Sequence, residues 1–324
     1  MNQMLDEVDS KSSERVGRVM TVLGLVEPTE LGRVLAHEHL FIDLYRVYQP
    51  HRDMKLSDPD LIRVELERFR EIGGGTVVDL TTPDLGRNPT SLREISHTTG
   101  LHVVMGSGHY RKPFYGVEID RLPTRQIQDA MVRDVLEGES GVLPGVIGEI
   151  GTDESFIAAV EERVHRASAR AARKTGLSVV THSLGSDVGL AQLDLMTEEG
   201  LSPDRVAIGH ADTFPHWQYH EELLGQGAYL IYDTIRGLND YETRRTARLI
   251  LRAVEAGFEN RILLSHDVCA TGHLSNYGGR GFTYVHGEFL GMLAAEGLSK
   301  VVLEKLAGRN AQRFLTIRSL PDLD

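Results

Sequence analysis

The chain has little cysteine and no long apolar run. Among its 324 residues, Cys269 is the single cysteine, so an intrachain disulfide is excluded. This cysteine usage is typical of proteins in a reducing cytoplasm. No apolar run approaches the ~20 residues that a membrane-spanning helix needs. We therefore expect a cytoplasmic protein whose fold is stabilised by an apolar core.

Basic charge is also scarce. The 35 lysine and arginine residues face 47 aspartate and glutamate residues, which gives a formal net charge of −12. Such a chain repels nucleic acid and anionic membrane surfaces. With 41% hydrophobic and 25% charged residues, the composition is that of a globular protein. We expect a small-molecule partner, and neither a nucleic acid nor a membrane.

The beginning of the chain differs in composition from the rest. Residues 1–16 are polar and lack the apolar core of a secretory signal, so we expect a flexible N-terminal leader there. Residues 17–324 contain no low-complexity linker and are expected to form a single domain. This length suits one α/β barrel.

Eight short aliphatic runs follow one another along the chain, and each ends in turn or polar residues. Because they are continuously apolar rather than alternating, they predict parallel strands buried on both faces. Segments with helical spacing lie between them, for example 60–75, 156–176 and 242–261, and 299–315 would close the fold. This order predicts a (β/α)8 TIM barrel, with a doubly wound open sheet as the alternative. The runs begin at Val34, Thr76, His102, Gly145, Ser178, Val206, Tyr229 and Ile262.

The first run, VLAHEH, carries two histidines one residue apart. In an extended strand residues i and i+2 share a face, so His37 and His39 project together while Glu38 points away. Two neutral imidazoles side by side in a core cost desolvation twice, whereas a bound cation uses both as ligands. The pair indicates a metal site if further ligands lie nearby. The alternative is a pair of core histidines that are hydrogen-bonded to the backbone.

Polar residues also stand at the ends of other runs. In a barrel these strand ends meet at one rim, where catalytic residues lie. Imidazole nitrogen and carboxylate oxygen together suit zinc, iron or manganese. Six ligands exceed the number that one catalytic zinc takes, so we expect two divalent ions about 3.5–4 Å apart, bridged by a carboxylate. The predicted ligands are His37, His39, Glu149, His182, His210 and Asp267.

Together these motifs resemble the phosphotriesterase family of the amidohydrolase superfamily. The matching features are the HxH of LAHEHL, then GVIGEIGTD, THS, IGHAD, LLSHDVC and RNAQRFL, in family order from about Val34 to Phe314. The resemblance implies that Glu149 bridges the two ions at the position where many members carry a carboxylated lysine. The chain is therefore similar to the glutamate-bridged branch of the family.

The resemblance also divides the remaining ligands between the two ions. It implies that His37, His39 and Asp267 hold the more buried ion. It implies that His182 and His210 hold the more exposed ion.

Two further matches concern the substrate. Tyr110 in GSGHYRKPFY resembles a residue that lines the site of the family's lactonases. The sequence YDTIRG resembles their strand-seven loop, with Asp233 aligned and Arg236 near the position of a lactonase arginine. Thr234 occupies that position itself. The organophosphatases carry a histidine there, and its absence argues against phosphotriesters.

These residues predict a hydrolase. Two ions that share one water make hydroxide available at neutral pH, and this metal-bridging hydroxide is the expected nucleophile. Asp267 would accept its proton and pass it to the leaving group, and Tyr110 would hydrogen-bond the leaving oxygen. The expected substrate is a lactone or another carboxylic ester. The alternatives are a phosphoric ester hydrolase and a catalytically silent barrel that binds a ligand. Zinc is the first expectation for the metal, with manganese, cobalt and iron as alternatives.

Cationic side chains lie on the loops of the same predicted rim. Arg111, Arg236 and Arg280 are expected to bind a carboxylate or phosphate of the substrate, or else to pair with surface acids. His266 is expected to pack between barrel and helices, because it faces away from Asp267 in a strand. Related barrels are frequently dimers, so a homodimer is expected by analogy.

Overall fold

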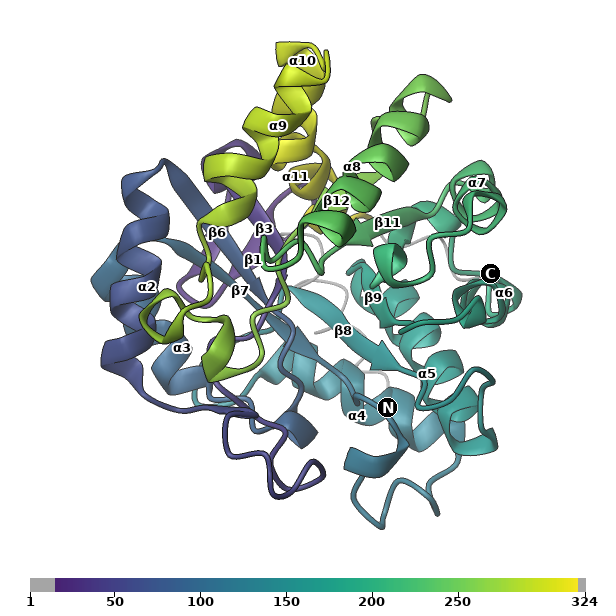
Figure 1. Ribbon diagram of the computed structural model, residues 1–324. Coiled ribbons are helices and arrows are strands. Elements are labelled where there is room, and N and C mark those ends of the chain that lie inside the picture. The colour runs from purple at the N-terminus through teal and green to yellow at the C-terminus, as the bar shows by residue number, and fades with distance from the viewer. Residues whose placement is uncertain (1–14, 320–324) are drawn as a thin grey trace.

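The computed structural model describes residues 15–319, so residues 1–14 of the expected leader lie outside the described part. Eight strands form one sheet in which all paired neighbours run parallel. They are β3 (Arg33–Glu38), β6 (Gly74–Asp79), β7 (His102–Ser107), β8 (Val146–Gly151), β9 (Val179–His182), β10 (Val206–Gly209), β11 (Tyr229–Tyr232) and β12 (Ile262–Leu264). Their order in the sheet is their order in the chain, and helices surround them (Figure 1). The predicted (β/α)8 barrel is confirmed, and the open sheet is wrong.

The outer layer consists of helices that alternate with the strands. They are α2 (Pro59–Glu71), α3 (Pro89–Thr99), α4 (Thr124–Glu137), α5 (Ala159–Thr175), α6 (Val188–Glu198), α7 (Trp217–Gln226), α8 (Asp240–Glu255), α9 (Leu290–Ala295), α10 (Lys300–Glu304) and α11 (Asn310–Leu315). Side-chain caps fix where two of them begin: Asp58 accepts two backbone amides at α2, and Asn239 does so at α8. The helical segments expected from the sequence differ from α2, α5 and α8 only at their ends.

Two short hairpins lie outside the barrel sheet. They pair β1 (Val19–Thr21) with β2 (Gly24–Val26) and β4 (Ile42–Asp43) with β5 (Lys55–Leu56).

The barrel closes where the first strand meets the last. Beyond the end of β12, the backbone amide of Asp267 donates to the carbonyl of His37 at 3.1 Å, and that of His39 donates to the carbonyl of Val268 at 3.2 Å. These bonds place the residues after β12 directly beside the end of β3. This contact between the two strands is called the seam below.

Glu38 holds the seam with its side chain. Its Oε1 accepts hydrogen bonds from the Ser265 hydroxyl at 2.8 Å and from the backbone amide of His266 at 2.9 Å, and it lies 2.7 Å from His266 Nδ1. Its Oε2 accepts from the backbone amide of Val268 at 2.8 Å. The fully buried carboxylate therefore joins the two ends of the sheet.

A β-bulge in β3 decides which side chains face the barrel interior. Val34 and Ala36 belong to the apolar cluster that fills the interior, so a regular strand would turn Glu38 inward as well. Instead, the register between β3 and β6 shifts just before Glu38. The bulge directs His37 and His39 inward and Glu38 towards the seam, as bulges near active sites commonly do.

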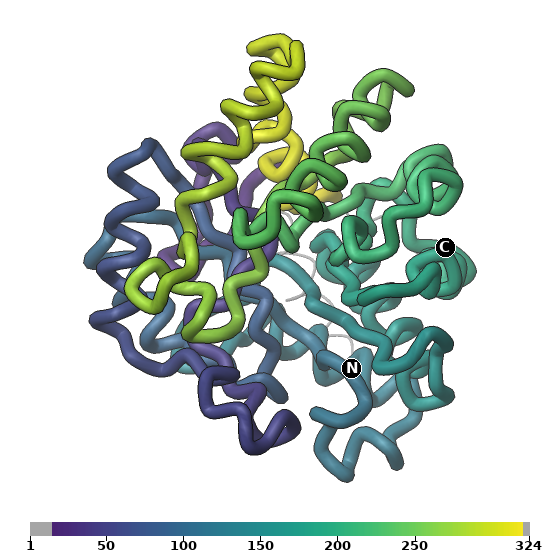
Figure 2. Tube along the Cα trace, viewed as in Figure 1, coloured from purple at the N-terminus to yellow at the C-terminus, as the bar shows by residue number. Residues whose placement is uncertain are grey.

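A long segment after β12 covers part of the barrel mouth. It contains the short helices η6 (Thr271–His273) and η7 (Ser275–Tyr277), and it crosses to α2 in Figure 2. There the Ser275 hydroxyl and the backbone amide of Asn276 donate to Glu65 Oε1 at 2.6 and 3.2 Å. The buried carboxylate of Glu65 thus fixes this segment to the outer layer.

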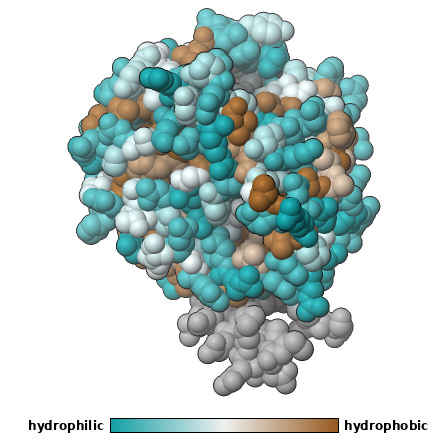
Figure 3. All heavy atoms as spheres, turned by 90° about the horizontal axis from the view of Figure 1, so that it is seen from below, coloured by the Kyte–Doolittle hydropathy of each residue, from teal (hydrophilic) through white to brown (hydrophobic). Residues whose placement is uncertain are grey.

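The surface seen in Figure 3 is mainly hydrophilic, and its apolar side chains lie in separate small patches. Within residues 15–319, no helix is both long and apolar enough to cross a membrane.

Candidate metal centre

The barrel brings the six predicted ligand residues together at the carboxyl ends of its strands. His37 comes from the end of β3 and His39 directly follows that strand; one ligand each comes from β8 and β9, and one each from the segments after β10 and β12. Each of the six is at most 9% exposed. Neighbouring imidazole rings have centroids 4.4 to 5.3 Å apart. Side chains far apart in sequence thus form one buried cluster of nitrogen and oxygen donors.

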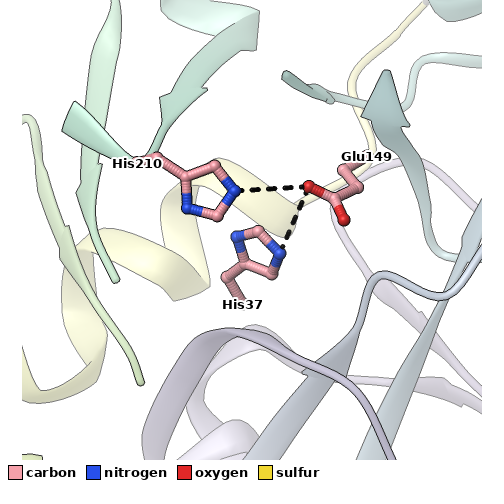
Figure 4. Close-up of side chains that lie close together, drawn as sticks. All are labelled: His37, Glu149 and His210. Atoms are coloured by element: carbon pink, nitrogen blue, oxygen red, sulfur yellow. Dashed lines mark ion pairs between the residues drawn. The ribbon is translucent and has the colours of Figure 1, made fainter. Parts of the chain in front are cut away.

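Two groups in this cluster have the geometry of a metal site. The first is His37, His39 and Asp267, and the second is His37, Glu149 and His210; in each, the donor atoms lie within 4.8 Å of one another. In the second group, Nε2 of His37 and Nε2 of His210 both point to Oε2 of Glu149, at 3.5 and 3.7 Å (Figure 4). The buried Nε2 of His37 has no hydrogen-bond partner in the described part of the chain. A buried, unpartnered nitrogen facing two carboxylates fits a bound cation.

His182 lies at the edge of the second group. Its Nδ1 is 2.9 Å from Glu149 Oε2 and 2.7 Å from His210 Nε2, so it hydrogen-bonds within the cluster. A hydrogen bond between two imidazoles requires a proton on one of the facing nitrogens. A metal ion at this position would replace that proton.

Asp233 orients two of these imidazoles at once. Its Oδ2 lies 2.8 Å from Nδ1 of His37, and its Oδ1 lies 2.8 Å from Nδ1 of His210. Its Oδ2 also accepts the backbone amide of His210 at 3.0 Å. The fully buried carboxylate fixes both rings with Nδ1 as the donor, so both Nε2 atoms face the cluster. This role is not apparent from the sequence, although Asp233 ends its apolar run just as the histidines end theirs.

His39 is held in a similar way by β6 and the residues after it. Its Nδ1 lies 2.9 Å from the Thr81 hydroxyl. Asp79, at the end of β6, accepts the backbone amides of Leu40 and Thr81 at 2.7 and 3.1 Å. This bonding leaves Nε2 of His39 directed at the cluster.

The electrostatics of the cluster are dominated by its carboxylates. Burial opposes a charged imidazole at His210, but the adjacent Asp233 outweighs burial and raises the pKa of His210 to about 10. Burial lowers the pKa of His182 to about 4, despite the nearby Glu149. Burial also opposes the ionised form of Glu149, yet His37 and His182 hold the pKa of Glu149 well below its usual range. An ionised carboxylate among imidazoles is a donor set that favours a cation.

Two of the candidate ligands have an unusual backbone conformation. His210 and Asp267 lie in the left-handed region, with φ of 56° and 52°. Non-glycine residues are rare in this region, and such strain clusters at functional sites. His210 follows β10 directly and Asp267 is the third residue after β12, and at both positions the conformation turns the side chain towards the cluster.

Tyr110 and Arg111 lie on the loop after β7, beside His182. The Tyr110 hydroxyl is 3.3 Å from Nε2 of His182, and the ring is 5% exposed. Arg111 forms an ion pair with Asp153 and stacks over the rings of Tyr110 and Phe114 at 5.2 and 5.5 Å. Tyr110 therefore borders the cluster directly, whereas Arg111 already has an acidic partner.

Arg236 and Arg280, which the sequence analysis grouped together, lie in different surroundings. Arg236 donates from Nη2 to the backbone carbonyl of Asp267 at 2.9 Å and to its Oδ2 at 2.7 Å. Arg280 pairs with Glu288 at 2.9 Å, and its side chain is 47% exposed. This pairing corresponds to the surface-acid alternative for Arg280, while Arg236 lies against a candidate ligand.

His266 and Cys269 flank Asp267 in the chain. His266 is fully buried between Glu38 and the helical layer, where its Nε2 accepts the backbone amide of Val285 at 2.9 Å. The Cys269 thiol lies 3.8 Å from Asp267 Oδ2.

Residues 17–315 of the chain match the Phosphotriesterase family. The "Phosphotriesterase homology protein" of Escherichia coli (strain K12) is 32% identical over 89% of this chain and 98% of that protein. An "N-acetyltaurine hydrolase" of Danio rerio is 28% identical over 94% of this chain and 100% of that protein.

The chain is also similar to solved structures. A Resiniferatoxin-binding protein from Rhodobacter sphaeroides superposes with a TM-score of 0.87 and 33% identity, covering 92% of this chain and 95% of that one. The fold and the cluster define a barrel enzyme with a site suited to metal ions. The chain belongs to the phosphotriesterase family and is a hydrolase of that family.

Proposed function

We propose that the chain is a metal-dependent hydrolase that holds two divalent ions and cleaves a carboxylic acid derivative. One observation carries the proposal: the buried, unpartnered Nε2 of His37 lies 3.5 Å from Glu149 Oε2 and 3.9 Å from Asp267 Oδ1. This nitrogen belongs to both groups of donors. We assign His37, His39 and Asp267 to one ion, His182 and His210 to the other, and Glu149 to the position between them.

The residues present fit such ions in type and in charge. Imidazole and carboxylate donors bind zinc, which is the first candidate, and they also bind manganese, cobalt and iron. When bound, two such ions lower the pKa of a shared water and polarise a substrate carbonyl oxygen.

The chain's own residues then handle the substrate and the proton. A water oxygen adds to the carbonyl carbon, the bond from that carbon to the leaving nitrogen or oxygen breaks, and the water proton is transferred to the leaving atom. We assign the proton transfer to Asp267, whose Oδ1 borders the cluster while Oδ2 accepts from Arg236. We assign Tyr110 a hydrogen bond to the substrate, since its hydroxyl borders the cluster beside His182.

The bond that is cleaved is proposed to be an amide, with the ester or lactone expected from the sequence as the second candidate. The support for the amide is the relative named for N-acetyltaurine hydrolysis, which matches nearly the whole chain. The ester remains a candidate because the same attack on a carbonyl serves both bonds.

Elemental analysis of purified protein, followed by a panel of N-acyl amino acids, lactones, aryl esters and phosphate esters, tests the proposal. We expect about two equivalents of divalent metal and hydrolysis of at least one carbonyl compound. E149A should lose both metal and activity, whereas E149Q should retain the shape of the side chain and still lose metal. Turnover of phosphate esters alone would assign the chain to phosphoric ester hydrolysis. Metal content near zero in protein grown with added zinc or manganese would favour a silent ligand-binding barrel.

A further inference from the structure

A pocket of about 650 Å³ lies at the amino-terminal end of the barrel, away from the metal cluster. Its walls come from the segments that precede β10, β11 and β12, and from α11 and the residues after it. Because the candidate ligands lie at the carboxyl ends of the strands, this pocket is separate from the proposed reaction site. Within the described part of the chain, its charged wall residues are Arg261, Arg313, Arg318 and Asp204. We call it the basal arginine pocket.

Arg261 places a fixed positive charge on one wall of this pocket. Its guanidinium lies over the ring of Tyr229, 4.9 Å from the ring centroid, and such stacking fixes a cation without neutralising it. The acidic wall residue, Asp204, is bonded to Arg318 instead, at 2.7 Å. Arg261 forms no ion pair among residues 15–319, so its N–H donors are available to a ligand.

Arg313 is held on a second wall by uncharged acceptors. Its Nη2 donates to Oδ1 of Asn310 at 2.7 Å, and it lies 3.2 and 3.3 Å from the backbone and side-chain oxygens of Asn260. Amide oxygens orient a guanidinium but leave its net charge in place. These bonds involve one nitrogen of the guanidinium, so Nε and Nη1 remain as donors.

A further arginine adds positive charge directly behind the pocket. Arg205 is 5% exposed, and its Nη1 donates to the backbone carbonyls of Phe314 and Thr316 at 3.2 and 3.1 Å. Its Nη2 donates to the carbonyl of Gly176 at 2.7 Å. Burial and the neighbouring Arg318 lower the pKa of Arg205 to about 10, so this guanidinium still carries its charge at pH 7. A buried charge that is bonded only to carbonyls favours an anion nearby.

We propose that the basal arginine pocket binds a small metabolite that carries a phosphate group. Four guanidinium groups lie around one carboxylate in a chain whose formal net charge is −12, so the local potential is opposite in sign to that of the whole molecule. The planar donors of arginine match two phosphate oxygens at once, which favours phosphate as the anion. The volume lies in the range of small-molecule sites and leaves space for an organic part beside the phosphate.

Calorimetric titration with glycerol 3-phosphate and with 3-phosphoglycerate tests the proposal, and glycerol is the neutral control. We expect both anions to bind the wild-type protein. R261M should weaken their binding by about 10- to 100-fold, because it removes a charged hydrogen bond, and should leave hydrolase activity unchanged. R309M is the matched control, since Arg309 is exposed, pairs with Glu304 at 2.7 Å and lies outside the walls of the pocket. It should bind both anions as the wild type does. No binding to the wild-type protein, or equal binding to R261M, would overturn the proposal.

Two further variants identify where the anion binds. A metal-loaded cluster also attracts anions, and E149A should therefore keep the binding if the basal arginine pocket is the site. Binding that is lost in E149A and kept in R261M would assign the anion to the cluster and overturn the proposal. Asp322 and Asp324 lie outside the described residues and follow Arg318 closely in the sequence. Binding that appears only in the double variant D322N/D324N would assign the pocket to the chain's own carboxylates and overturn the assignment to a phosphorylated metabolite.

Discussion

Asp233 Oδ2 lies 2.8 Å from Nδ1 of His37 in the fully buried interior of the barrel. The other oxygen of the same carboxylate lies 2.8 Å from Nδ1 of His210. One side chain therefore sets the orientation of an imidazole from β3 and of one that follows β10. Because His37 belongs to both donor groups, this carboxylate supports the whole cluster.

We expect D233N to weaken metal binding by about 10- to 100-fold, because an amide offers one acceptor where the carboxylate offers two. A competition titration with a chromogenic chelator measures the change. T81V is the matched control, since it removes the partner of His39 alone and should have the smaller effect. Unchanged metal affinity in D233N would contradict the role given to this carboxylate.

Y110F should lower kcat/KM by about fivefold and leave the metal content unchanged, since one hydrogen bond contributes about 1 kcal/mol. Steady-state kinetics with elemental analysis of the same sample measure both quantities. Tyr115 provides the control, because its buried hydroxyl has no partner in the described residues and its ring packs near His109. Y115F should therefore behave as wild type. If both variants lost activity equally, Tyr110 would have a structural role only.

E38A should lower the free energy of unfolding by about 3–5 kcal/mol, because it leaves the donors of Ser265, His266 and Val268 buried without a partner. Urea unfolding followed by circular dichroism measures the loss. The exposed Glu71 offers a control, and E71Q should stay within about 0.5 kcal/mol of wild type. A similarly small effect for E38A would mean that the seam does not depend on this carboxylate.

Acid should destabilise the protein through its buried histidines. Burial lowers the pKa of His165 to about 4, and its Nδ1 lies 2.8 Å from the carbonyl of Glu161. Below about pH 6.5 the unfolded chain binds a proton at this position that the folded chain does not bind, so stability falls as the pH decreases towards 4. The slope for one such group is about 1.4 kcal/mol per pH unit. H165Q should show a shallower loss between pH 6.5 and 4.5 in urea unfolding, and an unchanged slope would contradict the assignment.

The barrel could be predicted because its strands are buried on both faces, which leaves continuous apolar runs in the sequence. The ends of those runs also located the polar cluster, since the carboxyl ends of barrel strands meet at one rim. Runs such as those at Val206 and Ile262 are followed directly by His210 and by Ser265, His266 and Asp267. The position of the cluster therefore follows from the order of residues along the chain, without any knowledge of which residues touch in space.

Three features could not be predicted in this way. The bulge in β3 depends on the pairing with β6, and the alternation from Val34 and Ala36 would have placed Glu38 inside the barrel. The role of Asp233 depends on two other strands that approach it in space. The last predicted helix contains a π-helical turn at η9 (Lys305–Arg309), which helical periodicity does not reveal.

The order of residues 37, 38 and 39 links catalysis to the integrity of the fold. His37 and His39 face the donor cluster, and Glu38 between them faces the seam. Local unfolding of the end of β3 would therefore displace two imidazoles at the same time as it opens the sheet. Loss of activity on heating and hydrogen exchange of the backbone amides at the end of β3 should therefore follow the same time course. A partly unfolded state in which β3 has detached from the barrel would have no activity, even if the rest of the barrel remained folded.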